Sequence, residues 1–235
     1  MSAGQLDRPM SDEIEVDFYF DPVCGWAWRT SIWMRRVAKQ RPIKVNWKLL
    51  ALAVINSPDD WTKDPNEGHL HAAGLNRTLI LARRTGGNDA LDRLYVAYGN
   101  AIFGTRELLT WAQRPNKALR ADVTDPAYRA LQAQCLKQAG LPRTLYEEAM
   151  ADSSTESEWM AEHHAGVAQV DAFGTPTIAL TGSHIGVFGP VVDPVPDGAE
   201  ALALWDSVHL ALKAPYLYEL KRNRPRRSNV QFADR

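Results

Sequence analysis

The chain has 235 residues, of which 45% are hydrophobic, and its 27 lysines and arginines nearly balance its 28 aspartates and glutamates. This length suits one large domain, or one domain with a sizeable insertion. The balanced charge argues against a general field that would attract nucleic acid or acidic partners. A short basic run, "KRNRPRRS" at 221–228, is interpreted as a solvated tail because one such run is a weak signal.

The first residues, "MSAGQLDRPMSDE", lack the apolar segment of a signal peptide, and no apolar run reaches the length of a membrane span. We therefore expect a cytoplasmic protein without a membrane or nucleic-acid partner. Its two cysteines, Cys24 and Cys135, are too few for a disulfide framework. Any redox role must come from an individual thiol.

The N-terminal pattern alternates between strand and helix. Residues 14–20, "IEVDFYF", alternate apolar and polar side chains and predict a strand. A helical pattern starts at Trp26 and should end before Pro42. Residues 43–52, "IKVNWKLLAL", alternate again and predict a second strand. This order predicts a βαβ unit in which the two strands are parallel.

The middle of the chain has a helical pattern interrupted by loops. Residues 56–66 and 114–126 predict loops, and "RTGG" at 84–87 predicts a turn. The segments with helical spacing are 67–84, 89–103, 126–139, 142–151 and 154–170. We expect these segments to form a large all-helical insertion.

Strand character returns towards the C-terminus. Residues 176–182, "PTIALTG", and 185–190, "IGVFGP", predict a β-hairpin, and a last helix is expected at 198–213. The expected organisation is an α/β unit in two halves around the insertion. The halves are 14–55 (βαβ) and 166–222 (ββα), the insertion is 56–165, and the tails are 1–13 and 223–235.

Cys24 lies between the first predicted strand and helix, in "FYFDPVCGWAWRT" at 18–30. A thiolate there would face unpaired helix N–H groups and the positive end of the helix dipole. Such a position lowers a thiol pKa from about 8.5 to roughly 3.5–7.5, and the thiolate is the nucleophile. The position alone leaves two interpretations open, a catalytic nucleophile and a buried structural cysteine.

The segment "FGTPT" at 173–177 is a second candidate feature. A Thr175–Pro176 bond at the start of a strand can be cis. If this loop lies beside Cys24, the backbone N–H and C=O of Thr175 could pair with an extended ligand. The alternative is an ordinary trans proline at the first position of a strand.

Together these features resemble the thioredoxin fold in its DsbA-like form. The segments "FDPVCGWAWRTSIW", "HHAGVAQVDAFGTPT", "VFGPVV", "VPDG" and "YLYELKR" resemble, in the same order, the actinobacterial mycothiol-dependent nitroreductase group of DsbA-like oxidoreductases. This resemblance covers residues 14–222. A more distant resemblance links the architecture to kappa-class glutathione transferases and 2-hydroxychromene-2-carboxylate isomerases.

The resemblance implies roles for particular residues. Cys24 matches the attacking cysteine of the family motif C-P-W-C, and Trp26 matches its tryptophan. Thr175 and Pro176 match the cis-proline loop that faces the cysteine. The implied co-substrate is mycothiol or a similar low-molecular-weight thiol, the other substrate is an electrophile or a disulfide, and dimers occur among the relatives.

Two histidines and three tryptophans complete the candidate site. His163 and His164 match the family's "HHAG" segment, and no role is assigned to them. Without other cysteines or histidines at ligand spacing, no metal site is expected. A pocket lined by Trp26, Trp28 and Trp61 is expected beneath the helical insertion.

The chain departs from the C-P-W-C motif at two positions. Gly25 replaces the proline and leaves the helix start less constrained. Ala27 replaces the second cysteine, so Cys24 has no neighbouring thiol that could resolve a mixed disulfide. Cys135 could do so only if its thiol came within a few ångströms of Cys24, and its position within the helical insertion argues against this.

Three functions remain open. The first is a monothiol oxidoreductase in which Cys24 reacts with a disulfide or electrophile and an external thiol completes the cycle. The second is a transferase or isomerase of the kappa-class type, in which residue 24 activates a thiol cofactor without a disulfide cycle. The third is a non-catalytic binding protein on a thioredoxin scaffold.

Overall fold

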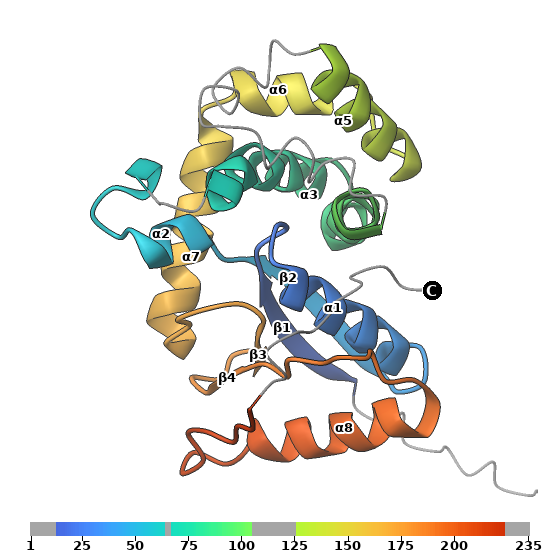
Figure 1. Cartoon of the computed structure of the whole chain (residues 1–235), viewed down its shortest axis with the longest axis vertical. Helices are drawn as coiled ribbons and strands as arrows, with labels where there is room; N and C mark the ends of the chain where they lie inside the picture. Colours follow the sequence, from blue (N-terminus) through green and yellow to red (C-terminus); the bar gives the residue numbers. More distant parts are fainter. Residues whose placement is uncertain (1–12, 64–66, 105–125, 224–235) are drawn as a thin grey trace, which may run out of the picture.

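A computed structural model of the chain describes residues 13–63, 67–104 and 126–223. A four-stranded sheet lies at one end of the molecule, and helices of the middle of the chain gather at the other end (Figure 1). The expected loop at 114–126, both expected tails and most of the basic run at 221–228 lie outside the described residues.

The sheet has the strand order β2-β1-β3-β4. β1 pairs in parallel with β2, and β3 is antiparallel to both β1 and β4. The strands are β1 (Ile14–Phe20), β2 (Ile43–Leu49), β3 (Thr177–Leu180) and β4 (Gly186–Phe188). The predicted parallel pair and the predicted C-terminal hairpin are both confirmed.

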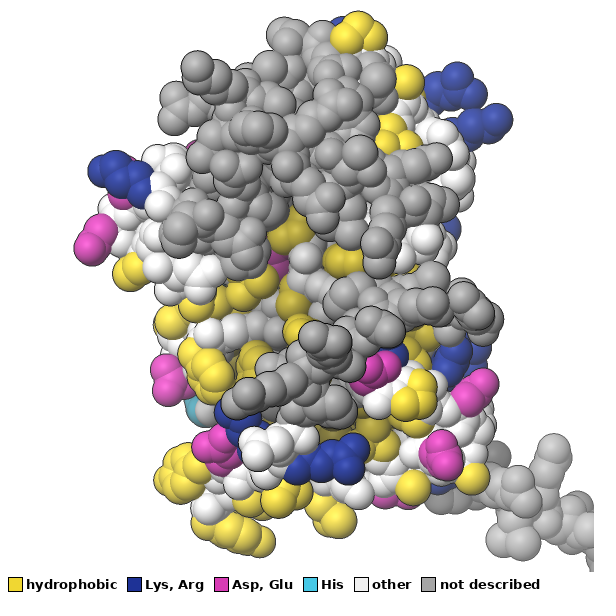
Figure 2. Space-filling view, in the orientation of Figure 1, with side chains coloured by type: hydrophobic (Ala, Val, Ile, Leu, Met, Phe, Trp, Pro, Cys, Tyr) yellow, Lys and Arg dark blue, Asp and Glu magenta, His cyan; other side chains and the backbone are white. Residues whose placement is uncertain are grey.

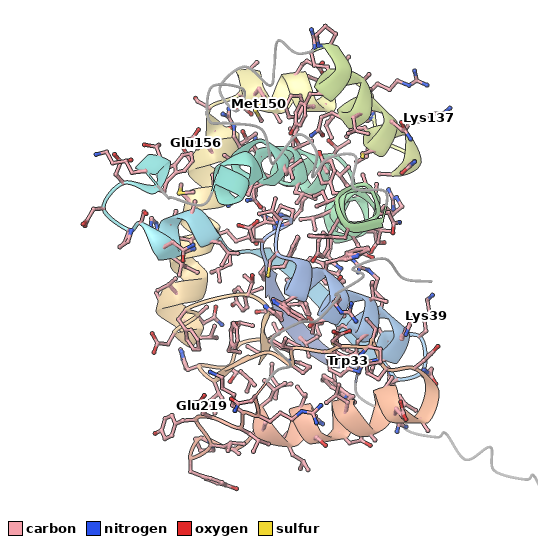
Figure 3. The ribbon with its side chains drawn as sticks, viewed as in Figure 1. Trp33, Lys39, Lys137, Met150, Glu156 and Glu219 are labelled. Carbon is pink, nitrogen blue, oxygen red and sulfur yellow. The ribbon has the colours of Figure 1, made fainter. Side chains whose placement is uncertain are left out.

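Helices cover both faces of the sheet. α1 (Gly25–Ala38) and α8 (Gly198–Ala211) share the apolar core that contains Phe18 and Phe20 of β1. Trp33 lies between these two helices and donates its indole N–H to the carbonyl of Ala201 at 3.0 Å (Figure 3). The opposite face packs under α7 (Ser154–Val170), where Tyr19 and Val170 belong to a second apolar cluster. The apolar side chains of the alternating pattern in β1, such as Phe18 and Phe20, therefore lie on the face that packs against the main core, as predicted.

The helical end is built from the residues between β2 and α7. Its helices α3, α5 and α6 lie together (Figure 1). The elements of this region are α2 (Leu52–Asn56), η1 (Trp61–Lys63), α3 (Glu67–Gly99), the π-helical turn η2 (Asn100–Gly104), α5 (Pro126–Gln138) and α6 (Leu145–Ala151). α3 is broken at Gly86 and Gly87, where Gly87 has a φ of 70°, so the turn predicted at 84–87 is confirmed.

The predicted ends of three elements are corrected. β2 ends at Leu49 instead of residue 52, because the N–H groups of Ala51 and Leu52 bond to side chains rather than to another strand. Residues 52–56 form α2 instead of strand and loop. α6 starts at Leu145, three residues later than predicted. α7 continues through the expected domain boundary at 165–166, as Figure 1 shows.

An arginine of α1 joins the sheet unit to the helical end. The Arg35 guanidinium bonds to a carboxylate oxygen of Asp92 in α3 at 2.6 and 2.9 Å. It also lies over the rings of Trp47 and Tyr95, 4.3 and 5.1 Å from their centroids. Tyr95 of α3 in turn stacks on Phe20 of β1 at 3.9 Å. These ionic and aromatic contacts hold α3 against the end of β1 that leads to Cys24.

Candidate active site

Cys24 is the N-cap residue of α1. Its backbone is extended (φ −82°, ψ 106°), and its carbonyl accepts the N–H of Trp28 at 2.9 Å. Its Sγ accepts the N–H of Ala27 at 3.4 Å, as a capping side chain does. The side chain is half-buried. The turn that carries it follows β1 and lies between the sheet and α3 (Figure 1).

The sheet register brings Cys24 to the Thr175–Pro176 loop. β1 and β3 are antiparallel, and Tyr19 pairs with Thr177, so the segment after β1 lies beside the segment before β3. The Cys24 thiol donates to the carbonyl of Thr175 across 3.5 Å. The Thr175–Pro176 peptide bond is cis in the structure. Two features 151 residues apart in the sequence thus meet at one point.

The Thr175 side chain is also placed at this point. Thr175 is 5% exposed, and its Oγ1 is buried without a hydrogen-bond partner in the part of the chain that the structure describes. A buried hydroxyl without a partner is costly, because it loses its bonds to water. The hydroxyl is enclosed by the protein beside the thiol, where it favours the thiolate form of Cys24.

The pKa of Cys24 corrects the expectation from the helix dipole. Burial raises the pKa of the Cys24 thiol, and the charge of Asp21 raises it further. The Thr175 side chain and the backbone N–H groups of Ala27 and Trp26 lower the pKa, but burial is the largest single effect and the net shift is upward. Cys24 is therefore a protonated thiol at neutral pH in the free protein. The capping contact is where the sequence places it, but desolvation is the larger effect.

The raised pKa predicts the pH dependence of thiol reactivity. Only the thiolate reacts, so the alkylation rate of Cys24 by iodoacetamide should keep rising with pH and reach no plateau below about pH 9. The measurement is the second-order rate between about pH 6 and 10, with the product assigned to Cys24 by peptide mass spectrometry. A plateau near neutral pH would contradict the burial of the thiol.

The residues after Cys24 form the first turn of α1. Gly25 and Trp26 are partly buried, and Ala27 is fully buried. The thiol therefore meets the backbone N–H of Ala27 at the position where the C-P-W-C motif carries a second cysteine. Cys135 lies in α5 of the helical end, is 1% exposed, and has its Sγ 4.0 Å from the carbonyl of Ala97.

One of the three tryptophans that were expected to line a pocket lies in the core. Trp28 is 3% exposed and packs edge-on against Tyr95 with ring centroids 5.6 Å apart, so the expectation that it lines the pocket is corrected. Its ring belongs to the main apolar core. Trp61 is partly buried in η1, and its ring contacts Trp159 of α7 at 5.7 Å.

The two histidines have different environments. His163 is 3% exposed and its Nδ1 accepts the N–H of Ala51 at 3.3 Å, whereas His164 is exposed. Burial, and then the neighbouring His164, lower the pKa of His163 to about 4. His163 is thus a neutral acceptor that anchors the start of α2 to α7. It supports the segment next to Cys24 rather than contacting the thiol.

The depressed pKa of His163 predicts a stability change in mild acid. An unfolded histidine takes up a proton below about pH 6.5, while folded His163 does so only near pH 4. Stability should therefore fall as the pH drops from about 6.5 to 4, by about 3 kcal/mol in total. Denaturation at several pH values should show a shallower fall for His163→Asn, which keeps an acceptor but does not titrate. Equal slopes for both proteins would contradict this assignment.

One residue of the site was missed at the sequence level. Asp21 precedes Cys24 by three positions and is fully buried, with both carboxylate oxygens bonded to backbone N–H groups. The signal was an aspartate between an apolar strand and a proline, a pattern that favours a side-chain-to-backbone turn.

Among the residues that the structure describes, no group of three or more potential metal ligands is found, and no helix is long and apolar enough to cross a membrane.

Comparison with known proteins identifies the family. The family model "Rv2466c-like: Mycothiol-dependent nitroreductase Rv2466c" matches residues 23–222 and therefore includes Cys24, Thr175 and Pro176. The chain belongs to this family. The Rv2466c-like chain is also 34% identical over 211 residues to "Uncharacterized protein Rv2286c" of Mycobacterium tuberculosis, covering 88% of this chain and 81% of that protein.

Solved structures support the fold of this Rv2466c-like protein. A 2-hydroxychromene-2-carboxylate isomerase aligns with a TM-score of 0.53 and 17% identity over 86% of this chain and 97% of the isomerase. A probable DsbA oxidoreductase, SCO1869 from Streptomyces coelicolor, aligns with a TM-score of 0.52 and 16% identity over 88% and 94% of the two chains. The expected DsbA-like thioredoxin fold with a large helical part is confirmed. Family and fold together indicate an oxidoreductase.

Proposed function

We propose that this protein is a cytoplasmic monothiol oxidoreductase that uses Cys24 and an external low-molecular-weight thiol such as mycothiol. The Cys24 thiolate attacks the mycothiol sulfur of a mixed disulfide, forms a Cys24–mycothiol disulfide and releases the other thiolate. A second mycothiol then attacks this intermediate, which yields mycothiol disulfide and the free Cys24 thiol. In the net reaction the mixed disulfide is reduced to a free substrate thiol, and the added mycothiol is oxidised to the disulfide level in mycothiol disulfide.

The proposal rests on the groups that surround Cys24 Sγ at the start of α1. Cys24 Sγ meets the Thr175 carbonyl on one side and the Ala27 N–H on the other, and no thiol stands at position 27. Cys135 is buried in a different helix, against Ala97. An adduct on Cys24 has no internal thiol next to it, so a thiol from solution has to release it.

The protonated state of Cys24 sets a condition on this chemistry. Because the pKa of the thiol is raised, the resting protein holds little thiolate at neutral pH. The reaction is then fastest with disulfides and electrophiles whose binding supplies polar partners for the sulfur. The Thr175 carbonyl, 3.5 Å from the thiol, is one polar group that already lies next to the reacting sulfur.

Replacing Ala27 by cysteine tests the missing resolution step. In Ala27→Cys the introduced thiol should attack the Cys24–mycothiol adduct, form an internal disulfide with Cys24 and release mycothiol. Intact mass spectrometry after exposure to mycothiol disulfide should show loss of two hydrogens in this variant and a mycothiol adduct in the natural protein. Ala27→Ser is the matched control and should keep the adduct. If the isolated Cys24–mycothiol adduct of the natural protein loses its mycothiol without added thiol, the proposal is contradicted.

A second function is favoured by the same raised pKa. A neutral thiol at a helix start can donate a hydrogen bond to the thiolate of a bound cofactor, as the transferase or isomerase hypothesis requires. In that case residue 24 never enters a disulfide, and serine could replace it in part. The Cys24→Ser variant discussed below distinguishes the two functions.

A further inference from the structure

Asp21 shapes the turn that presents Cys24. It follows β1 directly and is fully buried. Its Oδ1 accepts the N–H of Val23 at 3.1 Å, and its backbone carbonyl accepts the N–H of Cys24 at 3.0 Å. Two bonds from one residue thus close the turn between β1 and α1, as aspartates do when the side chain replaces a backbone acceptor.

The second carboxylate oxygen links this turn to α2. Asp21 Oδ2 accepts the N–H of Leu52, the first residue of α2, at 3.0 Å. The preceding N–H, that of Ala51, is held by His163 of α7. The N–H groups of Ala51 and Leu52 at the start of α2 are therefore held by two side chains. His163 of α7 accepts the first, and Asp21 of the Cys24 turn accepts the second. These hydrogen bonds link the cysteine turn, through the start of α2, to α7, the helix that connects the helical end to β3.

The negative charge of Asp21 also acts on the cysteine. A buried carboxylate is costly unless it is well hydrogen-bonded, and the N–H groups of Val23 and Leu52 supply such bonds. Its charge still opposes ionisation of the nearby thiol and contributes to the raised pKa of Cys24. The other titratable group that faces Cys24 from a packed element is the buried Tyr95 phenol of α3. Of these two groups, Asp21 is the nearer to Cys24 along the chain, because both residues lie in the same turn.

We propose that Asp21 is a positioning residue for Cys24: one carboxylate oxygen fixes the turn that carries the thiol, and the other fixes this turn to α2. The inference rests on Cys24 as the reacting group of the proposed function, but its test uses no mycothiol. A failed mycothiol reaction would therefore leave this test intact, and the reverse also holds.

Three variants distinguish the effect of Asp21 on the position of the Cys24 thiol from the effect of its charge on thiol ionisation. Asp21→Asn keeps the shape, removes the charge and loses one of the two acceptors. Asp21→Ala removes both carboxylate contacts. Asp17→Asn is the matched control, because Asp17 is a buried aspartate of β1 that accepts bonds from Asn46 and Thr181 on the sheet instead.

Two probes report separately on charge and position. Iodoacetamide is a small alkylating agent whose rate reports the thiolate fraction. The bulky aromatic disulfide 5,5′-dithiobis(2-nitrobenzoate) forms a mixed disulfide with Cys24 and releases one aryl thiolate, so it requires a defined approach to the sulfur. The ratio of the two rates at one pH cancels the thiolate fraction. The bulky disulfide is a dianion, so loss of the Asp21 charge by itself would raise this ratio, and a fall in the ratio therefore reports geometry. Peptide mass spectrometry assigns both products to Cys24 rather than to buried Cys135.

The proposal makes opposite predictions for the two readouts. In Asp21→Asn the iodoacetamide rate at about pH 7.5 should rise about threefold, because a nearby negative charge is lost. The rate ratio of the bulky disulfide to iodoacetamide should fall about tenfold, because the sulfur is no longer held in one place. Asp21→Ala, where folded, should show a further fall in the ratio, and Asp17→Asn should change neither value. An unchanged ratio in Asp21→Asn, or equal changes in Asp17→Asn, would overturn the proposal.

Discussion

Replacing Cys24 by serine should abolish the mycothiol adduct and lower mycothiol-dependent turnover by about a thousandfold or more, because a serine hydroxyl cannot form a disulfide. Nucleophiles of this kind account for losses of this size when they are removed. The fold should be retained, since serine is a good N-cap and its Oγ can accept the Ala27 N–H as Sγ does. Turnover of a mycothiol mixed disulfide and the intact mass after exposure to mycothiol disulfide are the two measurements.

The same variant decides between the two candidate functions. Cys135→Ala is the control, and it should keep the adduct because the buried thiol of α5 takes no part in the proposed cycle. If Cys24→Ser keeps a substantial share of turnover, the disulfide cycle is excluded and the thiol-activating transferase or isomerase becomes the better account.

Replacing Gly99 by alanine should destabilise the protein by about 2–4 kcal/mol, at the upper end of the usual cost of overpacking. Gly99 ends α3, and a Cβ there would overlap the indole ring of Trp28. Trp28 cannot move aside easily, because it is 3% exposed and packs against Tyr95. Since Tyr95 stacks on Phe20, a strained ring would push on the end of β1 that leads to Cys24.

Thermal and denaturant unfolding measure this effect. The melting temperature should fall by about 4–16 °C, given about 2–4 °C per kcal/mol for a chain of this size. Gly104→Ala is the matched control, because an added Cβ there meets no atom of the described residues within 4 Å, and it should shift stability by no more than about 0.5 kcal/mol. In a Trp28→Leu background Gly99→Ala should cost less. Equal costs in both backgrounds would contradict the assigned overlap.

The parts of the structure that follow from local patterns could be predicted. The alternation in 14–20 and the helical pattern from Trp26 place Cys24 at a strand–helix junction, and the structure puts it at the N-cap of α1. The antiparallel pairing of β1 with β3 then brings Thr175 to the thiol. This meeting could be expected from the family resemblance, but not from the spacing of the residues.

The parts that depend on tertiary packing could not be predicted. The direction of the Cys24 pKa shift is set by desolvation under the surrounding elements, which no sequence pattern reports. Trp28 and Trp26 have the same local signal, yet Trp28 turns into the aromatic contact with Tyr95. The end of β2 depends on two side chains distant in sequence, Asp21 and His163, that capture the N–H groups of residues 51 and 52.

The face in Figure 2 indicates where ligands could approach. Hydrophobic side chains are concentrated in its middle, between the helical end and the sheet end. The turn before α1 lies at this level of the molecule in Figure 1. A thiol in such surroundings is poorly hydrated, which agrees with its raised pKa.

The central claim is that Cys24 forms a disulfide with an external thiol and has no internal partner that releases it. Intact and peptide mass spectrometry of the natural protein, incubated with mycothiol disulfide above neutral pH, tests this most directly. We predict one mycothiol per chain, attached to Cys24, that persists after removal of excess reagent and is lost when reduced mycothiol is added. An unmodified Cys24, or an adduct that disappears into an internal disulfide with Cys135, would contradict the account.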